Sequence, residues 1–200
     1  MDFKSSETKD NLMRAFAGES QARNRYTIAA GQAREEKLYV IEAVFRFTAE
    51  QEKEHAEVFY KYLNEMAGEN IAIDGAYPVD ISKDVAALLR MAQHNEYEEH
   101  DDVYRNFARK ADEEGFSHIA DSFRQIAEIE KIHGNRFGKF AEWLEQGKLF
   151  VSDAECAWMC MECGHIYRGT EVPPVCPVCH NDRGYFIRLE FAPYTGECCM

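Results

Sequence analysis

Two stretches of the chain carry a glutamate three residues before a histidine, in the middle of segments rich in helix-forming residues. They are EKEH, with Glu52 and His55, and EKIH, with Glu130 and His133. Residues three apart lie on one face of a helix, roughly 5–6 Å from each other, so each pair can direct both side chains to one point. A solvent-exposed salt-bridge pattern would explain a single pair. The same faces otherwise carry apolar and aromatic residues, which predicts that both pairs are buried.

An earlier glutamate precedes each pair at almost the same distance. Glu19 stands 33 residues before Glu52, and Glu96 stands 34 residues before Glu130. This spacing indicates two similar helical hairpins. We expect a pseudo-twofold axis to relate them and to bring both sets of acids and imidazoles to one centre.

Residues 1–146 are predicted to form these hairpins as a four-helix bundle. The expected helices cover residues 6–36, 38–67, 82–114 and 116–146. Ser82 is a candidate cap for the third helix, and Gly147 is a candidate terminator of the fourth. The longer link between the hairpins favours a crossover connection. Gly18 and Gly31, inside the first helix, are expected to mark a close approach by another helix.

Buried carboxylates in this number need positive charge. Burying one unpaired carboxylate costs several kcal/mol, so five would exceed the ~5–15 kcal/mol by which a typical domain is stable. Two divalent metal ions would balance them, and carboxylate oxygen with imidazole nitrogen suits iron or manganese. The fifth acid is Glu99, which is in phase with Glu96 and is a candidate further ligand. His100, four residues after Glu96, is a candidate for supporting a metal ligand, but we expect it on the surface.

Tyr26 lies seven residues after Glu19 and hence on the same face of the first helix. Two interpretations remain open at this point. Tyr26 either donates a hydrogen bond or a proton to a metal ligand, or it packs in the core with its hydroxyl satisfied.

A second metal site is predicted near the C-terminus, where six of the seven cysteines lie. Cys160 and Cys163 form one Cys-x-x-Cys pair, and Cys176 and Cys179 form a second, twelve residues later. Two such pairs make a tetrahedral four-thiolate site. The spacing does not distinguish zinc from a single iron ion.

Composition divides the chain into two domains. Residues 147–156 are predicted to link the bundle to a second domain, residues 157–200. Cys198 and Cys199, in the tail of that domain, are not expected to be ligands.

The charge and hydropathy of the chain exclude several classes of partner. A formal charge of −13 argues against nucleic acid and against anionic lipid surfaces. No apolar run approaches the ~18–20 residues of a membrane span, so no membrane partner is expected. The first residues lack an apolar signal region, and a cytoplasmic protein is therefore expected.

Taken together, these motifs resemble those of the rubrerythrins over nearly all of residues 1–192. The matching segments are AGES with Glu19, EKEH, EYEE with Glu96 and Glu99, EKIH, and both cysteine pairs. The resemblance implies a mainly α fold, in which a ferritin-like four-helix bundle holds a non-haem di-iron centre. It implies that a small rubredoxin-like β domain with one mononuclear Fe(Cys)4 centre follows the bundle.

The resemblance also implies roles for the ligands of the di-iron centre. Glu52 and Glu130 would bridge the two irons. Glu19 and Glu96 would be terminal carboxylates, and His133 would bind one iron.

Three further residues enter through the resemblance. Glu99 and His55 would alternate as ligands of the other iron as its oxidation state changes. Tyr104 would act beside the centre in the same way as Tyr26.

The function that the resemblance implies is the reduction of hydrogen peroxide to water, as protection against oxidative stress in an anaerobe or microaerophile. Electrons would come from an external NAD(P)H-dependent reductase or a rubredoxin and pass through the rubredoxin-like centre. A homodimer is implied, with that centre beside the di-iron site of the partner. Two alternatives stay open: a ferroxidase or O2-reducing di-iron oxidase, and a non-enzymatic iron-binding or adaptor protein with a zinc ribbon.

Overall fold

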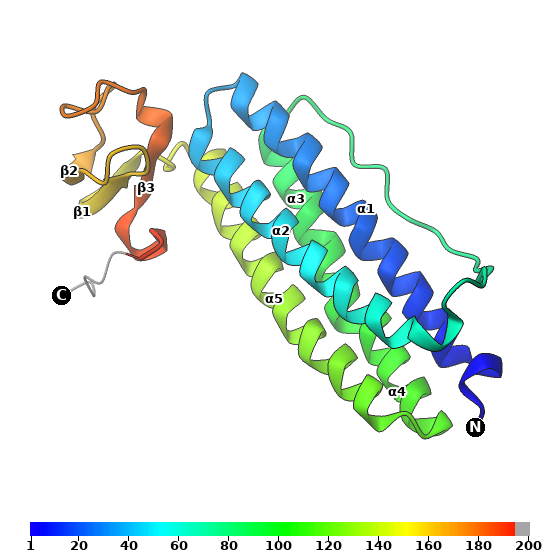
Figure 1. Ribbon diagram of the computed structural model, residues 1–200. Coiled ribbons are helices and arrows are strands. Elements are labelled where there is room, and N and C mark those ends of the chain that lie inside the picture. Colours follow the sequence, from blue (N-terminus) through cyan, green and yellow to red (C-terminus); the bar gives the residue numbers. More distant parts are fainter. Residues whose placement is uncertain (195–200) are drawn as a thin grey trace.

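The computed structural model describes residues 1–194, so Cys198 and Cys199 lie outside the described residues. Five α-helices come first and a small β domain follows (Figure 1). The helices are α1 (Glu7–Glu35), α2 (Tyr39–Tyr62), α3 (Val85–Glu98), α4 (Tyr104–Glu114) and α5 (Ser117–Glu145). No helix within this part of the chain is long and apolar enough to cross a bilayer.

The helices form a bundle of two antiparallel hairpins (Figure 1). α1 packs along α2, and α3 with α4 packs along α5. Residues 67–84 connect the hairpins and run along the outside of α1 from one end of the bundle to the other (Figure 1). We call this connection the crossover segment. The predicted bundle with a crossover is therefore confirmed.

The third helix starts later than expected. α3 begins at Val85, and its cap is Asp84, whose Oδ1 accepts a hydrogen bond of 2.9 Å from the backbone N–H of Ala86. Ser82 instead accepts a 3.0 Å hydrogen bond from the N–H of Asp84. The prediction of Ser82 as the cap was wrong, because an equally good capping residue lies two positions nearer the helix.

The third helix is also not continuous. Residues Glu99–Val103 form a π-helical turn between α3 and α4, which we call the π-turn. A π-turn accommodates one more residue than the same length of α-helix. It therefore shifts the phase of every later residue on this helix relative to α3.

The two glycines of α1 do not mark a helix–helix approach. A Cβ on Gly31 would meet no atom within 4 Å, and one on Gly18 would lie 3.7 Å from the ring of Tyr77 in the crossover segment. The close approach occurs instead on α5, where a Cβ on Gly138 would lie 2.2 Å from the Nε2 atom of Gln93 on α3.

Two apolar clusters fill the bundle, one on each side of its centre. The first includes Phe45 and Phe137, toward the α1–α2 turn. The second includes Phe59 and Phe123, toward the opposite end. Because Glu52 lies between Phe45 and Phe59 on α2, the polar centre of the bundle is enclosed by aromatic side chains above and below.

The C-terminal domain is a three-stranded antiparallel sheet of β1 (Val151–Cys160), β2 (Ile166–Glu171) and β3 (Phe186–Arg188), in the order β2-β1-β3. Trp158 and Phe186 are fully buried in its core. Part of the expected linker is thus not irregular, because residues 151–156 form the first half of β1.

This domain packs against the end of the bundle where α1 turns into α2 (Figure 1). Ile187 is buried in the same cluster as Val40 of α2. The rings of Tyr39 and Tyr185 stack with their centroids 4.1 Å apart. The four cysteines therefore lie beyond one end of the helices, while the acids and histidines lie in the middle.

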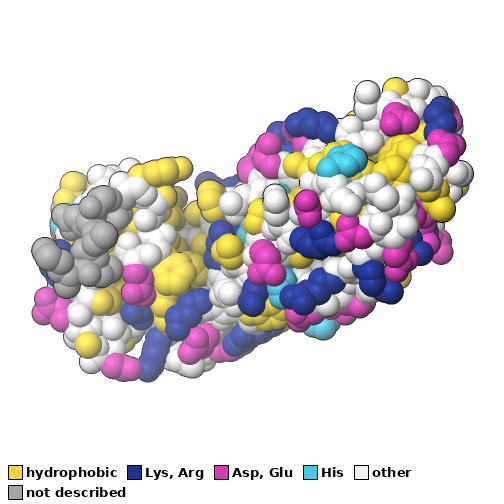
Figure 2. All heavy atoms as spheres, turned by 90° about the horizontal axis from the view of Figure 1, so that it is seen from below, with side chains coloured by type: hydrophobic (Ala, Val, Ile, Leu, Met, Phe, Trp, Pro, Cys, Tyr) yellow, Lys and Arg dark blue, Asp and Glu magenta, His cyan; other side chains and the backbone are white. Residues whose placement is uncertain are grey.

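Acidic and basic side chains are interspersed over the bundle on the face shown in Figure 2. That face presents no continuous basic stripe of the kind that tracks a phosphate backbone.

Candidate metal centres

Six ionisable side chains from four helices meet in the middle of the bundle. They are Glu19 of α1, Glu52 and His55 of α2, Glu96 of α3, and Glu130 and His133 of α5. The four glutamates are at most 1% exposed, and His55, the most exposed member, reaches 7%. The sequence predicted all six, and the structure brings them together.

The six form two overlapping groups of four. Glu19 and His55 belong to one group, and Glu96 and His133 belong to the other, while Glu52 and Glu130 belong to both. Within each group the candidate ligand atoms all lie within 4.8 Å of one another. Two four-ligand sites that share two carboxylates are the arrangement expected for a pair of adjacent metal ions.

The distances show how tightly the atoms converge. His55 Nδ1 lies 2.9 Å from Glu130 Oε1 and 3.2 Å from Glu52 Oε2. His133 Nδ1 lies 2.9 Å from Glu52 Oε1 and from Glu130 Oε2. The imidazole rings are nearly parallel, with centroids 5.6 Å apart.

Despite these short distances, the converging atoms lack hydrogen-bond partners. Both carboxylate oxygens of Glu52 and of Glu130 are buried without one in the described residues, and so are the Nδ1 atoms of both histidines. The carboxylate and imidazole atoms therefore lie close together without pairing with one another, as ligand atoms of shared metal ions do. These residues fit divalent metal ions with a preference for oxygen and nitrogen ligands, such as iron.

The electrostatics of the centre also favour the binding of positive charge. Burial, and then the neighbouring carboxylates of Glu130 and Glu52, raise the pKa of Glu19 well above its usual range. Burial and Glu52 do the same to the pKa of Glu96. Two divalent cations offset this repulsion and let the carboxylates remain ionised.

Two buried tyrosines donate hydrogen bonds to Glu96 and Glu19, the two glutamates that belong to only one ligand group each. The phenol of Tyr26, on α1, donates a 2.5 Å hydrogen bond to Glu96 Oε1. The phenol of Tyr104, on α4, donates to Glu19 Oε1. Burial and nearby carboxylates raise the pKa of both phenols well above the usual range, so both keep their protons. For Tyr26, the interpretation as a hydrogen-bond donor to a ligand is the one that the structure supports.

The π-turn explains how Tyr104 reaches the centre. Tyr104 lies eight residues after Glu96, which in a regular α-helix places the two about 80° apart around the axis. The extra residue of the π-turn restores the phase that Tyr26 has with Glu19. Helical spacing alone therefore missed Tyr104, which entered the prediction through the family resemblance.

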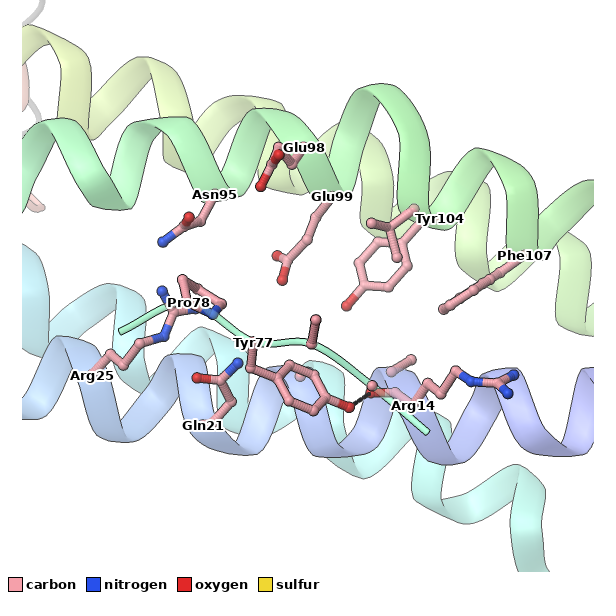
Figure 3. A pocket seen from close by; sticks show the side chains of 15 residues that line it. Arg14, Gln21, Arg25, Tyr77, Pro78, Asn95, Glu98, Glu99, Tyr104 and Phe107 are labelled. Atoms are coloured by element: carbon pink, nitrogen blue, oxygen red, sulfur yellow. Dashed lines mark hydrogen bonds between the residues drawn. The ribbon is translucent and has the colours of Figure 1, made fainter. Parts of the chain in front are cut away.

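Glu99 stands apart from the six. It belongs to neither group of converging atoms, although it lies close enough to raise the pKa of Glu19 further. Its side chain extends from the π-turn toward α1 (Figure 3). The prediction of Glu99 as a ligand thus stays a prediction.

The prediction that His100 lies on the surface was wrong. His100 is only 4% exposed. Its Nδ1 lies 2.7 Å from Asp101 Oδ1, and its Nε2 lies 3.4 Å from Glu128 Oε1 on α5. His100 therefore lies against α5 and belongs to neither group of converging ligand atoms.

The four cysteines Cys160, Cys163, Cys176 and Cys179 form the predicted second site. The Sγ atoms of Cys160 and Cys179 are 3.7 Å apart, as are those of Cys163 and Cys176. A tetrahedral site with bonds of ~2.3 Å has sulfur–sulfur edges of about 3.8 Å. All four are free thiols, so their geometry fits a four-thiolate metal site.

Local backbone features support this cysteine site. The residue after the last cysteine, His180, has a left-handed φ of 61°. The backbone N–H of Asn181 lowers the pKa of Cys179 to about 6, which favours the thiolate that binds metal.

Comparisons with known proteins agree with both centres. The family model described as Rubrerythrin matches residues 10–141, and the one described as Rubrerythrin, rubredoxin-like domain matches residues 158–187. The protein named Rubrerythrin from Clostridium perfringens is 45% identical over 184 residues, which are 92% of this chain and 94% of that protein. The one from Nitratidesulfovibrio vulgaris is 39% identical over 183 residues, with the same coverage of 92% and 94%.

A solved structure described as the fully reduced state of nigerythrin (all ferrous) has the same fold. It superimposes with a TM-score of 0.61 at 29% sequence identity, covering 92% of this chain and 90% of the other. These matches confirm the expected fold class, a ferritin-like bundle followed by a rubredoxin-like β domain, and the expected pair of metal centres.

Proposed function

The chain belongs to the rubrerythrin family, and from this membership we propose that it is a peroxidase that reduces hydrogen peroxide to water. The observation that carries the proposal is that Glu52 and Glu130 belong to both ligand groups. Shared carboxylates hold two metal ions close enough to act on one small molecule.

The stoichiometry of the reaction suits a paired site. Hydrogen peroxide takes up two electrons and two protons to become two water molecules. When bound, a pair of iron ions supplies both electrons in one encounter, which avoids a one-electron step that releases hydroxyl radical.

The ligand roles follow from the two groups. Glu52 and Glu130 would hold both metal ions, because each belongs to both ligand groups and has both oxygens buried without a hydrogen-bond partner. Glu19 and Glu96 would each hold one metal ion, and each accepts a hydrogen bond from one tyrosine.

The remaining candidates bind at the ends of the pair. His133 would bind the metal ion on the Glu96 side. His55 would bind the metal ion on the Glu19 side, and Glu99 would be the alternative ligand at that position.

The tyrosines are the proton-holding groups of the site. Because the pKa values of Tyr26 and Tyr104 are raised, both phenols carry protons at neutral pH and orient Glu96 and Glu19. The surrounding aromatic rings exclude bulk water, which strengthens these hydrogen bonds.

The four cysteines would hold one iron ion as an Fe(Cys)4 site, and this centre would supply electrons one at a time. Its domain packs at Tyr39, and His55 lies 16 residues farther along α2, a distance of about 24 Å at ~1.5 Å per residue. This separation favours transfer between protomers of a homodimer, in which the cysteine centre of one chain lies beside the metal pair of the other. Sedimentation that finds a monomer at micromolar concentration would contradict this arrangement.

An external NAD(P)H-dependent reductase or a rubredoxin is the proposed electron donor. The formal charge of −13 suits docking to a basic surface on such a partner. The five described cysteines are free thiols, which suits the reducing conditions of the cytoplasm. Protection against oxidative stress follows from the proposed reaction.

Anaerobic stopped-flow tests the proposal. The fully reduced protein is mixed with hydrogen peroxide or with air-saturated buffer, and the visible band of the ferric four-thiolate centre is followed. Fast return with peroxide and slow return with oxygen is the expected result. Equal or faster return with oxygen would indicate an O2-reducing oxidase or ferroxidase, and no visible band would indicate a zinc ribbon.

A further inference from the structure

A chamber of about 220 Å³ lies between α1 and the helix that contains the π-turn (Figure 3). Its walls come from α1, from the crossover segment, and from the stretch between α3 and α4. Its charged lining side chains are Arg14, Arg25, Glu98 and Glu99, and its other polar lining side chains are Gln21, Tyr77, Asn95 and Tyr104.

Glu99 connects this chamber to the metal pair. Its carboxylate points into the chamber, with the side chain of Tyr104 beside it (Figure 3). Glu99 is half-buried, whereas Glu19 and Glu96 are 0% exposed. Within residues 1–194 no side chain donates a hydrogen bond to Glu99, and the Nε atom of Arg25 is buried without a partner. The partly exposed carboxylate of Glu99 therefore offers an acceptor to a small polar molecule in the chamber, next to the centre.

Two arginine–aspartate pairs fix the crossover segment over this chamber. At one end, Arg14 Nη2 lies 2.6 Å from Asp74 Oδ1. At the other, Arg25 Nη1 lies 2.5 Å from Asp80 Oδ2, which also accepts a 2.7 Å hydrogen bond from Asn95 Nδ2. Both Arg25 and Asp80 have mostly buried side chains, so this second pair is screened less by solvent than a surface pair.

Between these two pairs, residues 75–78 form the roof of the chamber. The hydroxyl of Tyr77 donates a 3.1 Å hydrogen bond to the carbonyl of Arg14. The ring of Tyr77 lies against two glycines, where a Cβ would stand 3.0 Å away at Gly75 and 3.7 Å away at Gly18. The absence of side chains at these glycines lets the ring lie low over the opening.

We propose that this chamber is the route by which hydrogen peroxide reaches Glu99, and that the roof restricts the route to small hydroperoxides. The inference rests on the proposed peroxidase function. A volume of 220 Å³ is below the ~300–1,000 Å³ of pockets that take drug-sized molecules. A molecule of two oxygen atoms passes, whereas an aromatic hydroperoxide needs the space that Tyr77 fills.

A second depression approaches the centre from the other side, at His55. Its other lining residues are Phe47, Glu50, Gln51, Glu54 and Ile129. We assign the access route to the chamber at Glu99 because the side chain of Glu99 is partly exposed there, whereas His55 is only 7% exposed.

The size restriction is tested with Tyr77→Ala, and Tyr60→Ala serves as the matched control. Tyr60 is 57% exposed and does not line the chamber. The reduced holoprotein is mixed with hydrogen peroxide or with cumene hydroperoxide. Tyr77→Ala is expected to raise the rate with cumene hydroperoxide about tenfold and to change the rate with hydrogen peroxide by less than about twofold. Tyr60→Ala is expected to change neither.

The route itself is tested without turnover, by the rate at which azide binds to the oxidised protein. Gly18→Leu places a side chain in the chamber and is expected to slow azide binding about tenfold. Glu50→Trp places one in the depression at His55 and is expected to leave the azide rate unchanged.

Two outcomes would overturn the proposal: an unchanged preference between hydroperoxides in Tyr77→Ala, or slower azide binding in Glu50→Trp and not in Gly18→Leu. If Gly18→Leu does not fold, the comparison of Tyr77→Ala with Tyr60→Ala and the azide rate of Glu50→Trp still decide. Failure of the peroxidase function itself is distinguishable, because the wild-type protein would then not react with hydrogen peroxide while the azide measurement remained informative.

Discussion

Gly184 of the rubredoxin-like domain lies directly against the backbone of Lys37 in the α1–α2 turn, so that a Cβ on Gly184 would stand 1.9 Å from the Lys37 carbonyl oxygen. Backbone cannot move aside as a flexible side chain can. The substitution Gly184→Ala is therefore expected to separate this domain from the bundle, and faster proteolysis between residues 146 and 151 would report the separation. Gly169→Ala is the control, because its Cβ would meet only the side chain of Tyr167, at 3.0 Å. Equal proteolysis of the two variants would contradict the prediction.

Removal of a carboxylate that belongs to both ligand groups should abolish the binding of both metal ions. Glu52 belongs to both ligand groups, whereas Glu19 belongs to one. Metal analysis of Glu52→Ala should find close to no bound iron in the bundle, and Glu19→Ala should retain about one ion per chain. Glu54→Ala, on the same helix but exposed, should retain both. Similar losses in Glu52→Ala and Glu19→Ala would show that the two positions do not depend on Glu52 in the way proposed.

The two tyrosine hydrogen bonds should affect the reaction more than the fold. Tyr26→Phe and Tyr104→Phe each keep the ring and remove the donor to Glu96 or Glu19. Each is expected to slow reoxidation by hydrogen peroxide by about tenfold to a hundredfold, the range for removal of a hydrogen-bond partner of a metal ligand. Tyr62→Phe, whose hydroxyl pairs with Ser122 at the far end of α2, is the control. Unchanged rates in both variants would assign the phenols a packing role alone.

The N-terminus of α1 is held by an acid from α4, and its stability should depend on pH. Glu114 accepts hydrogen bonds from the N–H groups of Glu7 and Thr8, at 3.0 and 2.8 Å, and from the Thr8 hydroxyl. Partial burial acts to raise the pKa of Glu114, but the bonds from Thr8 outweigh it and lower the pKa below 4.5. A lowered folded-state pKa means that the stabilisation is complete above the ordinary glutamate pKa and is lost as the pH falls through the folded-state value.

The matching experiment compares the free energies of unfolding of wild type and Glu114→Gln. The difference is expected to be about 1 kcal/mol at neutral pH, in the range for a lost helix cap, and to shrink below pH 4.5. The comparison cancels the acid sensitivity of the metal centres, which both proteins share. A difference that stays constant from pH 7 to pH 3 would contradict the cap.

Gly31 is a position at which a substitution is expected to stabilise the protein. It lies inside α1, and a Cβ at this position would meet no atom within 4 Å. Gly31→Ala should therefore stabilise the bundle by up to about 1 kcal/mol, the difference in helix propensity. A rise in the midpoint of thermal unfolding would report it. No rise, or a fall, would show that a contact in the assembled protein uses the bare backbone at this position.

The metal ligands of the bundle were predictable because helical periodicity places Glu52 with His55, and Glu130 with His133, on faces that are otherwise apolar. The two short cysteine spacings are an equally local signal. Both signals depend only on neighbouring residues, so no tertiary information was needed.

The π-turn was not predicted, although a one-residue difference in spacing between the two halves of the sequence indicates it. Tyr26 precedes Glu52 by 26 residues, and Tyr104 precedes Glu130 by the same 26. The distance from Glu19 to Tyr26 is seven residues, whereas that from Glu96 to Tyr104 is eight. The single extra residue of the second half therefore lies where the π-turn lies.

The other errors arose where tertiary contacts decide the outcome. His100 was expected in solvent, although its spacing of four residues from Glu96 favours the same face of the helix, and contacts with Asp101 and Glu128 accompany its burial. The glycines of α1 were expected at a helix contact, but composition does not say which neighbour approaches: Gly18 faces Tyr77 of the crossover segment, and the close helix contact is at Gly138.

The crossed hydrogen bonds of Tyr26 to Glu96 and of Tyr104 to Glu19 join one hairpin to the other, so neither hairpin contains a finished centre. Such reciprocity is what a duplicated hairpin would show if its ancestor had assembled as a pair of identical chains. An ancestor of that kind would have had two interchangeable metal positions. The π-turn, set in α3–α4 while α1 continues as an uninterrupted helix, breaks that equivalence. The single extra residue thus gives the two metal positions different neighbouring residues. The two positions can then take different roles, which exact symmetry would not allow.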